Sequence, residues 1–244
     1  MRASRWWAAL VVMAWACAPS MGQTSAKPAA AGQVLPITTS SAAGELLLQG
    51  QPANWSQASA RKVALNRTPP LYDTDEPAAE EIPVVEVRVL SAGGKLYAQL
   101  AWRDTTADAT TLQAVPNSSP ETRFLKVPTE ADDRFFDAAA IMVPTKASTG
   151  LNPSLQMGDV DHPVQIYYWN SARGAMLMEA QGRGTTQRTG HGFPANGAYD
   201  NRRWVVTFEL PAQPAGTPMA FAIWNGAQKD RDGRKYFSVW YTLE

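Results

Sequence analysis

The stretch that most limits the possible fold is residues 85–102. Apolar and polar residues alternate over 85–89, as in a strand with one buried face. The pair Gly93-Gly94 follows, and glycine tolerates the positive φ angles of a tight hairpin turn. The alternation resumes over 96–102. We therefore predict an antiparallel hairpin with one face against a core.

The rest of the chain after residue 43 repeats this character, with short apolar runs separated by glycine, proline and polar residues. Further strands are expected over 46–48, 138–143, 164–169, 204–210, 219–224 and 236–241, and long loops over 105–134 and 182–197. No helical period is sustained over ten residues. The pattern predicts an all-β fold: an antiparallel β-sandwich with long loops and few short helices.

The N-terminus has the layout of an export signal. Arg2 and Arg5 form a short basic region before an apolar run, residues 6–16, that is too short to span a membrane. We predict that residues 1–22 are a signal peptide and that the cleaved protein is periplasmic. Cleavage before Cys17 would instead leave a lipid anchor, but the residues before this cysteine match a lipoprotein box poorly.

Composition limits the remaining choices. Residues 23–43 are rich in Ala, Ser, Thr and Pro, which predicts a disordered leader, and no composition break divides residues 44–244, which we treat as one domain. Acidic and basic residues balance at 22 each, so no field favours nucleic acid or anionic membranes. Cys17 stands alone, which excludes a disulfide framework, thiolate zinc sites, iron–sulfur clusters and covalent haem attachment.

Two residues are candidate metal ligands. Lys235 precedes an aromatic run, residues 236–240; most lysines at a strand start are solvated, but apolar neighbours lower the pKa of an amine and free its lone pair. Met157 stands in a Met-Gly pair before the aromatic strand 164–169. Methionines usually fill gaps in a core, but a thioether is also a soft ligand that favours reduced iron. The residues alone leave both interpretations open.

Several motifs occur in one order along the chain, and together they carry a resemblance. They are Trp102-x-Asp104, the apolar run after Asp137, Met157-Gly158 before the strand with Ile166 and Trp169, and Ile223-Trp224 followed by Gly233-Arg234-Lys235 and Trp240. From Leu46 to the C-terminus the chain resembles the haem-b-binding γ subunits of the type II dimethyl-sulfoxide-reductase family. Ethylbenzene dehydrogenase, dimethylsulfide dehydrogenase, chlorate reductase and selenate reductase contain such subunits.

The resemblance implies an exported sandwich that holds one haem b with Met157 and Lys235 as axial ligands. It also implies a non-catalytic subunit, joined to a molybdopterin catalytic subunit and an iron–sulfur subunit. Such a subunit passes electrons between the clusters and a soluble carrier such as a periplasmic cytochrome c. Arg234 is a candidate partner for a haem propionate, because arginine suits bidentate carboxylate binding; the alternative is a surface arginine.

Other constellations have competing interpretations. Residues 159–162, Asp-Val-Asp-His, are a metal site or a polar loop, and residues 230–233, Asp-Arg-Asp-Gly, are part of a calcium loop or a hairpin turn. His191 is expected on an exposed loop. The alternative functions are an exported carbohydrate-binding module that uses exposed tryptophans and, last, a hydrolase, for which no nucleophile–base pair is recognisable.

Overall fold

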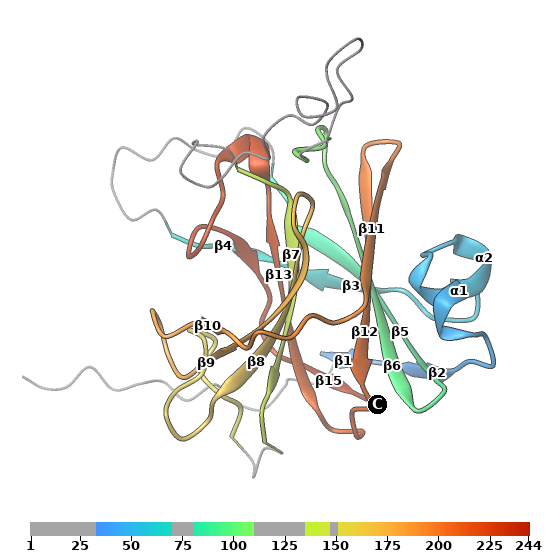
Figure 1. Ribbon diagram of the computed structural model, residues 1–244, viewed down its shortest axis with the longest axis horizontal. Coiled ribbons are helices and arrows are strands. Elements are labelled where there is room, and N and C mark those ends of the chain that lie inside the picture. The colour runs from blue at the N-terminus through green and yellow to red at the C-terminus, as the bar shows by residue number, and fades with distance from the viewer. Residues whose placement is uncertain (1–32, 70–80, 110–134, 147–150) are drawn as a thin grey trace, which may run out of the picture.

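Two packed β-sheets form the protein, as the computed structural model shows (Figure 1). The structure describes residues 33–69, 81–109, 135–146 and 151–244. The predicted signal peptide with Cys17, the start of the leader and most of the 105–134 loop lie outside these ranges. Within the described ranges, none of the helices has the length and apolar character needed to cross a membrane.

The larger sheet carries the candidate ligands. Its strands run in the order β1-β15-β13-β7-β8-β9-β10, and β14 pairs with both β13 and β4. The bounds are β1 Val34–Leu35, β4 Asn66–Arg67, β7 Ala138–Pro144, β8 Val164–Asn170, β9 Gly174–Ala180, β10 Gln187–Arg188, β13 Pro218–Trp224, β14 Tyr236–Phe237 and β15 Tyr241–Leu243.

The smaller sheet has the order β11-β12-β6-β5-β2, with β3 also paired to β5. Its strands are β2 Ile37–Thr39, β3 Arg61–Ala64, β5 Val84–Ala92, β6 Lys95–Arg103, β11 Ala195–Asp200 and β12 Arg203–Pro211. Strand pairs are antiparallel except β1 with β15 and β2 with β5. The predicted all-β sandwich is confirmed, with these parallel pairs as additions at its edges.

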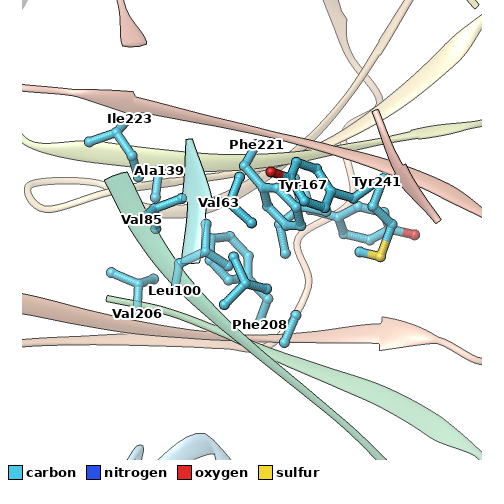
Figure 2. Packing of buried hydrophobic residues seen from close by; sticks show 14 of the residues in the cluster. Val63, Val85, Leu100, Ala139, Tyr167, Val206, Phe208, Phe221, Ile223 and Tyr241 are labelled. Atoms are coloured by element: carbon cyan, nitrogen blue, oxygen red, sulfur yellow. The ribbon is translucent and has the colours of Figure 1, made fainter. Parts of the chain in front are cut away.

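The predicted hairpin forms the centre of the smaller sheet. β5 and β6 pair across Gly93 and Gly94, whose φ angles are 55° and 72°. Alternate side chains of both strands enter the core between the sheets, where Val85 and Leu100 meet Phe221 and Ile223 of β13 (Figure 2). Burial of these apolar faces provides the main stabilisation of the sandwich.

The predictions for residues before 50 were wrong in two places. Residues 34–39, expected to be disordered, form β1 and β2, because β1 pairs with β15 from the far end of the chain and buries Leu35 completely. The expected strand at 46–48 is instead helix α1, Gly44–Leu48, followed by α2, Pro52–Trp55. Trp55 Nε1 donates to the Leu47 carbonyl at 3.0 Å, and both side chains cluster with Leu90 and Tyr97 of the smaller sheet. The two helices lie on the outer side of this sheet (Figure 1).

Candidate functional site

The outer face of the larger sheet, turned away from the sandwich core, is built from small side chains at its centre. On β7 and β13, bulky residues such as Ile141 and Phe221 point into the core. The alternate positions place alanines on the opposite face: Ala138, Ala140, Ala220 and Ala222. Ala140 lies directly opposite Ala222 in the ladder. We call these four residues the alanine bed.

Aromatic and sulfur-containing side chains border the alanine bed. Trp224, Trp240 and Met142 are buried in the same apolar cluster, and Met157 and Met178 pack against it. Trp240 Nε1 donates to the Pro153 carbonyl at 2.9 Å, which fastens the segment before Met157 to this face. Residues 153–157 of the connection between β7 and β8 therefore pack against the outer face of the larger sheet.

The Met157 side chain is delivered by a constrained turn. Met157 and Gly158 both have φ of 73°, in the left-handed region. The Gly158 N–H donates to the Ser154 carbonyl at 2.8 Å, and the Gly182 N–H donates to the Met157 carbonyl at 2.9 Å. The Met-Gly pair in the sequence thus has a backbone reason: the turn needs two positive φ angles in succession, and the second requires glycine.

Gly158→Ala is expected to loosen this turn. A Cβ atom at Gly158 would lie 2.6 Å from the His162 carbonyl oxygen and would also add strain at positive φ. We expect the free energy of unfolding to fall by about 2–3 kcal/mol, measured by urea denaturation. Gly216→Ala is the control, because Gly216 has φ of 87° but open space around it, and should cost only about 1 kcal/mol. Equal losses for the two variants would contradict this account of Gly158.

Lys235 approaches the bed from the other side. It lies directly before β14, which pairs with β13 so that Ala222 faces Phe237. Its amine lies 5.2 Å from the centre of the Trp224 ring. Lys235 Nζ is also 3.9 Å from Met157 Sδ, although 78 residues separate the two in sequence. The structure thus brings the two sequence-predicted ligands together.

The environment of the amine favours its neutral form. Burial of the side chain lowers the pKa of Lys235, and the opposing attraction of Asp232 is the smaller influence. A neutral amine has a free lone pair, whereas an ammonium group cannot bind a metal ion. A half-buried amine beside a thioether is therefore able to offer one nitrogen and one sulfur donor to the same guest.

Two aromatic residues of the site were not predicted as site residues from the sequence. Tyr168 of β8 packs edge-on against Trp224, with ring centres 5.3 Å apart. Trp224 Nε1 donates to the Asp232 carbonyl at 3.2 Å, which fixes the ring under the Lys235 amine. The available signal was the alternation of β8 and β13, which places both rings on the outer face once the core face is known.

Arg234, the third predicted site residue, lies next to Lys235 but has a carboxylate beside it. Its Nε atom is 3.5 Å from Asp230 Oδ1. Asp230 is fully buried and also binds Arg67. The segment containing them is a tight turn, because the Arg234 N–H donates to the Arg231 carbonyl at 2.9 Å. The turn interpretation of residues 230–233 is thereby confirmed over the calcium loop.

The remaining polar candidates have structural roles. Asp159 Oδ1 accepts hydrogen bonds from the N–H groups of Asp161 and His162 and lies 2.9 Å from His162 Nδ1, as in a polar turn. Among the described residues, no group of three or more His, Cys, Asp or Glu side chains could hold a metal ion. His191 is exposed, as expected.

The tryptophans contradict the carbohydrate-binding alternative, which needs exposed rings. Every tryptophan in the described part of the chain is buried: Trp55, Trp102, Trp169, Trp204, Trp224 and Trp240. Their rings pack within the core between the sheets, against the alanine bed or, for Trp55, on the outer face of the smaller sheet. No flat aromatic platform for a sugar is present among the described residues.

Comparison with known proteins gives the family. A respiratory nitrate reductase haem subunit (ORF7) of Haloferax mediterranei is 30% identical over 251 residues, which cover 95% of this chain and 78% of that protein. The dimethylsulfide dehydrogenase γ subunit of Rhodovulum sulfidophilum is 26% identical over 76% of this chain and 70% of its own. The chain belongs to the haem-binding γ subunits of the type II dimethyl-sulfoxide-reductase family.

A further relative of this γ-subunit family is the chlorate reductase γ subunit of Ideonella dechloratans, 26% identical over 85% of this chain and 83% of its own. No protein-family model matches the chain. Two solved structures of a family 9 carbohydrate-binding module from Caldicellulosiruptor kristjanssonii, with glucose and with cellotriose, align at 12% identity. They cover 85% of this chain and 84% and 83% of their own, with TM-scores of 0.38 and 0.39, too low to support any argument about function.

Proposed function

We propose that this γ subunit is a non-catalytic electron-transfer protein that binds one haem b through Met157 and Lys235. The observation that carries the proposal is the meeting of two donors of the right chemistry, Met157 Sδ and Lys235 Nζ, at 3.9 Å. They come from separate loops on the outer face of one sheet. The relatives named as haem and γ subunits add independent support.

The separation of the two donors suits a shared metal ion. The two donor atoms are 3.9 Å apart, so a metal ion placed between them could accept the thioether sulfur and the amine nitrogen together. Rotations of the flexible methionine and lysine side chains could adjust this separation to the ion.

The alanine bed fits a flat apolar guest. Small side chains on adjacent strands let a planar ring approach the sheet, while Trp224 and Trp240 provide apolar edges. Arg234 lies beside Lys235 at the polar margin, where a guest's carboxylate would emerge. These surroundings match the apolar ring and acidic substituents of haem.

The chain's own residues set the character of the site. Bound haem supplies a one-electron carrier. The Met157 thioether would favour the reduced state of iron and raise the reduction potential, and the neutral Lys235 amine would supply a nitrogen donor. Trp224 keeps water from one side of that amine.

The partners follow from the family. We propose that a molybdopterin catalytic subunit with an iron–sulfur subunit exchanges electrons with this protein, and that a soluble periplasmic cytochrome c completes the chain. The relatives from Rhodovulum sulfidophilum and Ideonella dechloratans are named as γ subunits of a dehydrogenase and a reductase. Export through the signal peptide predicted at residues 1–22 would put the protein in the same compartment as such a carrier.

Reconstitution tests the proposal. Purified protein mixed with haem should show the absorption spectrum of a low-spin b-type haem at a stoichiometry of one per chain. Extraction with acid acetone should remove the group, because no cysteine attaches it. A protein that stays colourless with excess haem, while folded by circular dichroism, would overturn the proposal.

Ala222→Phe tests the alanine bed. A phenylalanine at this half-buried outer position would project from the outer face of the sheet, away from the sandwich core. We expect haem affinity to fall by at least about tenfold, whereas stability falls by about 1–3 kcal/mol. The control is Ala198→Phe at an exposed position on β11, which should leave haem binding unchanged. Unchanged haem affinity in Ala222→Phe would show that the ring lies elsewhere.

A further inference from the structure

The backbone of Lys235 is fastened to a segment far upstream in the sequence. The Thr68 N–H and hydroxyl both donate to the Lys235 carbonyl at 2.9 Å. The Lys235 N–H donates in turn to Thr68 Oγ1 at 3.4 Å. Thr68 therefore forms hydrogen bonds with both the N–H and the carbonyl group of Lys235.

The segment that contains Thr68 is itself held by an ion pair. Arg67 donates from both terminal nitrogens to the Asp230 carboxylate, at 3.2 and 2.8 Å. Its guanidinium also lies 4.6 Å from the centre of the Tyr236 ring, directly across the β4–β14 ladder. Arg67 thus joins the strand before Thr68 to the residues on both sides of Lys235.

Asp230 anchors this ion pair from inside the protein. Its side chain is fully buried and accepts the Asn225 N–H at 3.2 Å, at the end of β13. A buried carboxylate is stabilised only when its oxygens are paired, and here two arginines and a backbone amide surround it. The loop from 225 to 235 is consequently tied to β4 at its middle.

The strands that Lys235 depends on are too short to hold it alone. β4 and β14 contain two residues each, and such a ladder has little stability of its own. The ion pair connects positions 163 residues apart, and it therefore adds stability that the short β4–β14 ladder lacks. Removal of the pair would leave the Lys235 backbone attached mainly through Thr68.

We propose that the Arg67–Asp230 pair is a positioning device for the Lys235 amine, which it aims at Met157 across the alanine bed. This inference rests on the proposed haem function. It assigns to Arg67 and Asp230 a role in ligand geometry, although neither touches the iron. Their effect should therefore appear in the spectrum and the retention of haem as well as in stability.

The test compares Arg67→Met with Arg67→Lys in haem-loaded protein. Loss of the ion pair with Asp230 in Arg67→Met should produce a high-spin fraction in the absorption and electron paramagnetic resonance spectra. Haem transfer to apomyoglobin should become about tenfold faster, as for other partners that orient metal ligands. Arg67→Lys keeps one charged contact to Asp230 and should recover part of the low-spin signal.

Arg203→Met is the matched control. Arg203 forms a more exposed ion pair with Glu86 on the smaller sheet, the sheet that does not carry the proposed ligands. It should lower the melting temperature without any change in spin state. If Arg67→Met likewise lowered only the stability and left the spectrum and the haem transfer rate unchanged, the pair would have a purely structural role and the inference would be wrong.

A milder variant covers the case in which Arg67→Met does not fold. Thr68→Val removes only the hydroxyl contacts to Lys235, and the inference predicts the same high-spin fraction on a smaller scale. A fully low-spin Thr68→Val protein would contradict it. Failure of the wild-type chain to bind haem would overturn the proposed function together with this inference, whereas normal variants of a haem-binding wild type would overturn the inference alone.

Discussion

Met157→Ala is expected to lower the reduction potential of haem bound to the protein by on the order of 100 mV, because the thioether that we propose as an iron ligand, and that would favour reduced iron, is gone. The ferric haem should show a high-spin spectrum, or the spectrum of iron with water in place of the sulfur. Lys235→Ala also removes the low-spin signal, and the double variant retains haem poorly. Spectroelectrochemical titration of the single variants measures these changes.

The chain offers a matched control for each ligand. Met178 of β9 packs against the same apolar cluster as Met157, and Lys229 is an exposed lysine at the end of the 3₁₀ helix η3, Gly226–Gln228, on the same C-terminal segment as Lys235. Met178→Ala and Lys229→Ala should leave the spectrum and potential unchanged. A spectral change in Met178→Ala, together with an unchanged spectrum in Met157→Ala, would show that Met178 of β9 and not Met157 supplies the sulfur.

Asp137→Asn should gain stability relative to the wild type as the pH rises from 4 to 7. Asp137 is fully buried, and burial raises the pKa of its carboxyl to about 6, despite hydrogen bonds from Gly226, Asp108 and Trp204. Since the folded state holds this proton more tightly than the unfolded state, the wild type loses up to about 3 kcal/mol over this range. The asparagine variant has no such loss.

The difference in unfolding free energy between variant and wild type, measured by urea denaturation at several pH values, isolates this group from the other carboxylates. Asp200→Asn is the control for the loss of one carboxylate, because Asp200 is exposed on β11. A difference for Asp137→Asn that is constant from pH 4 to 7 would show that the carboxyl titrates normally in the folded protein.

Much of the sandwich was predictable from local patterns. The alternation over 85–102 fixes the hairpin β5–β6, and the apolar run after Asp137 predicts a strand buried on both faces, as β7 is. The strands at 34–39 were missed because their partners are distant in sequence and their composition is that of a leader. Helix α1 was missed because three successive leucines also suit a buried strand.

The site depended on information that spacing does not contain. Met157 and Lys235 were chosen through the family resemblance, and nothing local shows that a turn after β7 and a turn before β14 converge. The Arg67–Asp230 pair was missed entirely, since a contact across 163 residues leaves no periodic trace. The Met-Gly pair did carry a local signal, since glycine after a ligand loop indicates a backbone of positive φ.

Iron K-edge X-ray absorption of the haem-loaded protein, recorded for the wild type, Met157→Ala and Lys235→Ala, tests most directly whether these two side chains hold the iron. We predict a sulfur neighbour of iron in the wild type that disappears in Met157→Ala, together with an axial nitrogen that is lost only in Lys235→Ala. A wild-type spectrum without sulfur, or a sulfur neighbour that persists in Met157→Ala, would contradict the claim that these two side chains hold the iron.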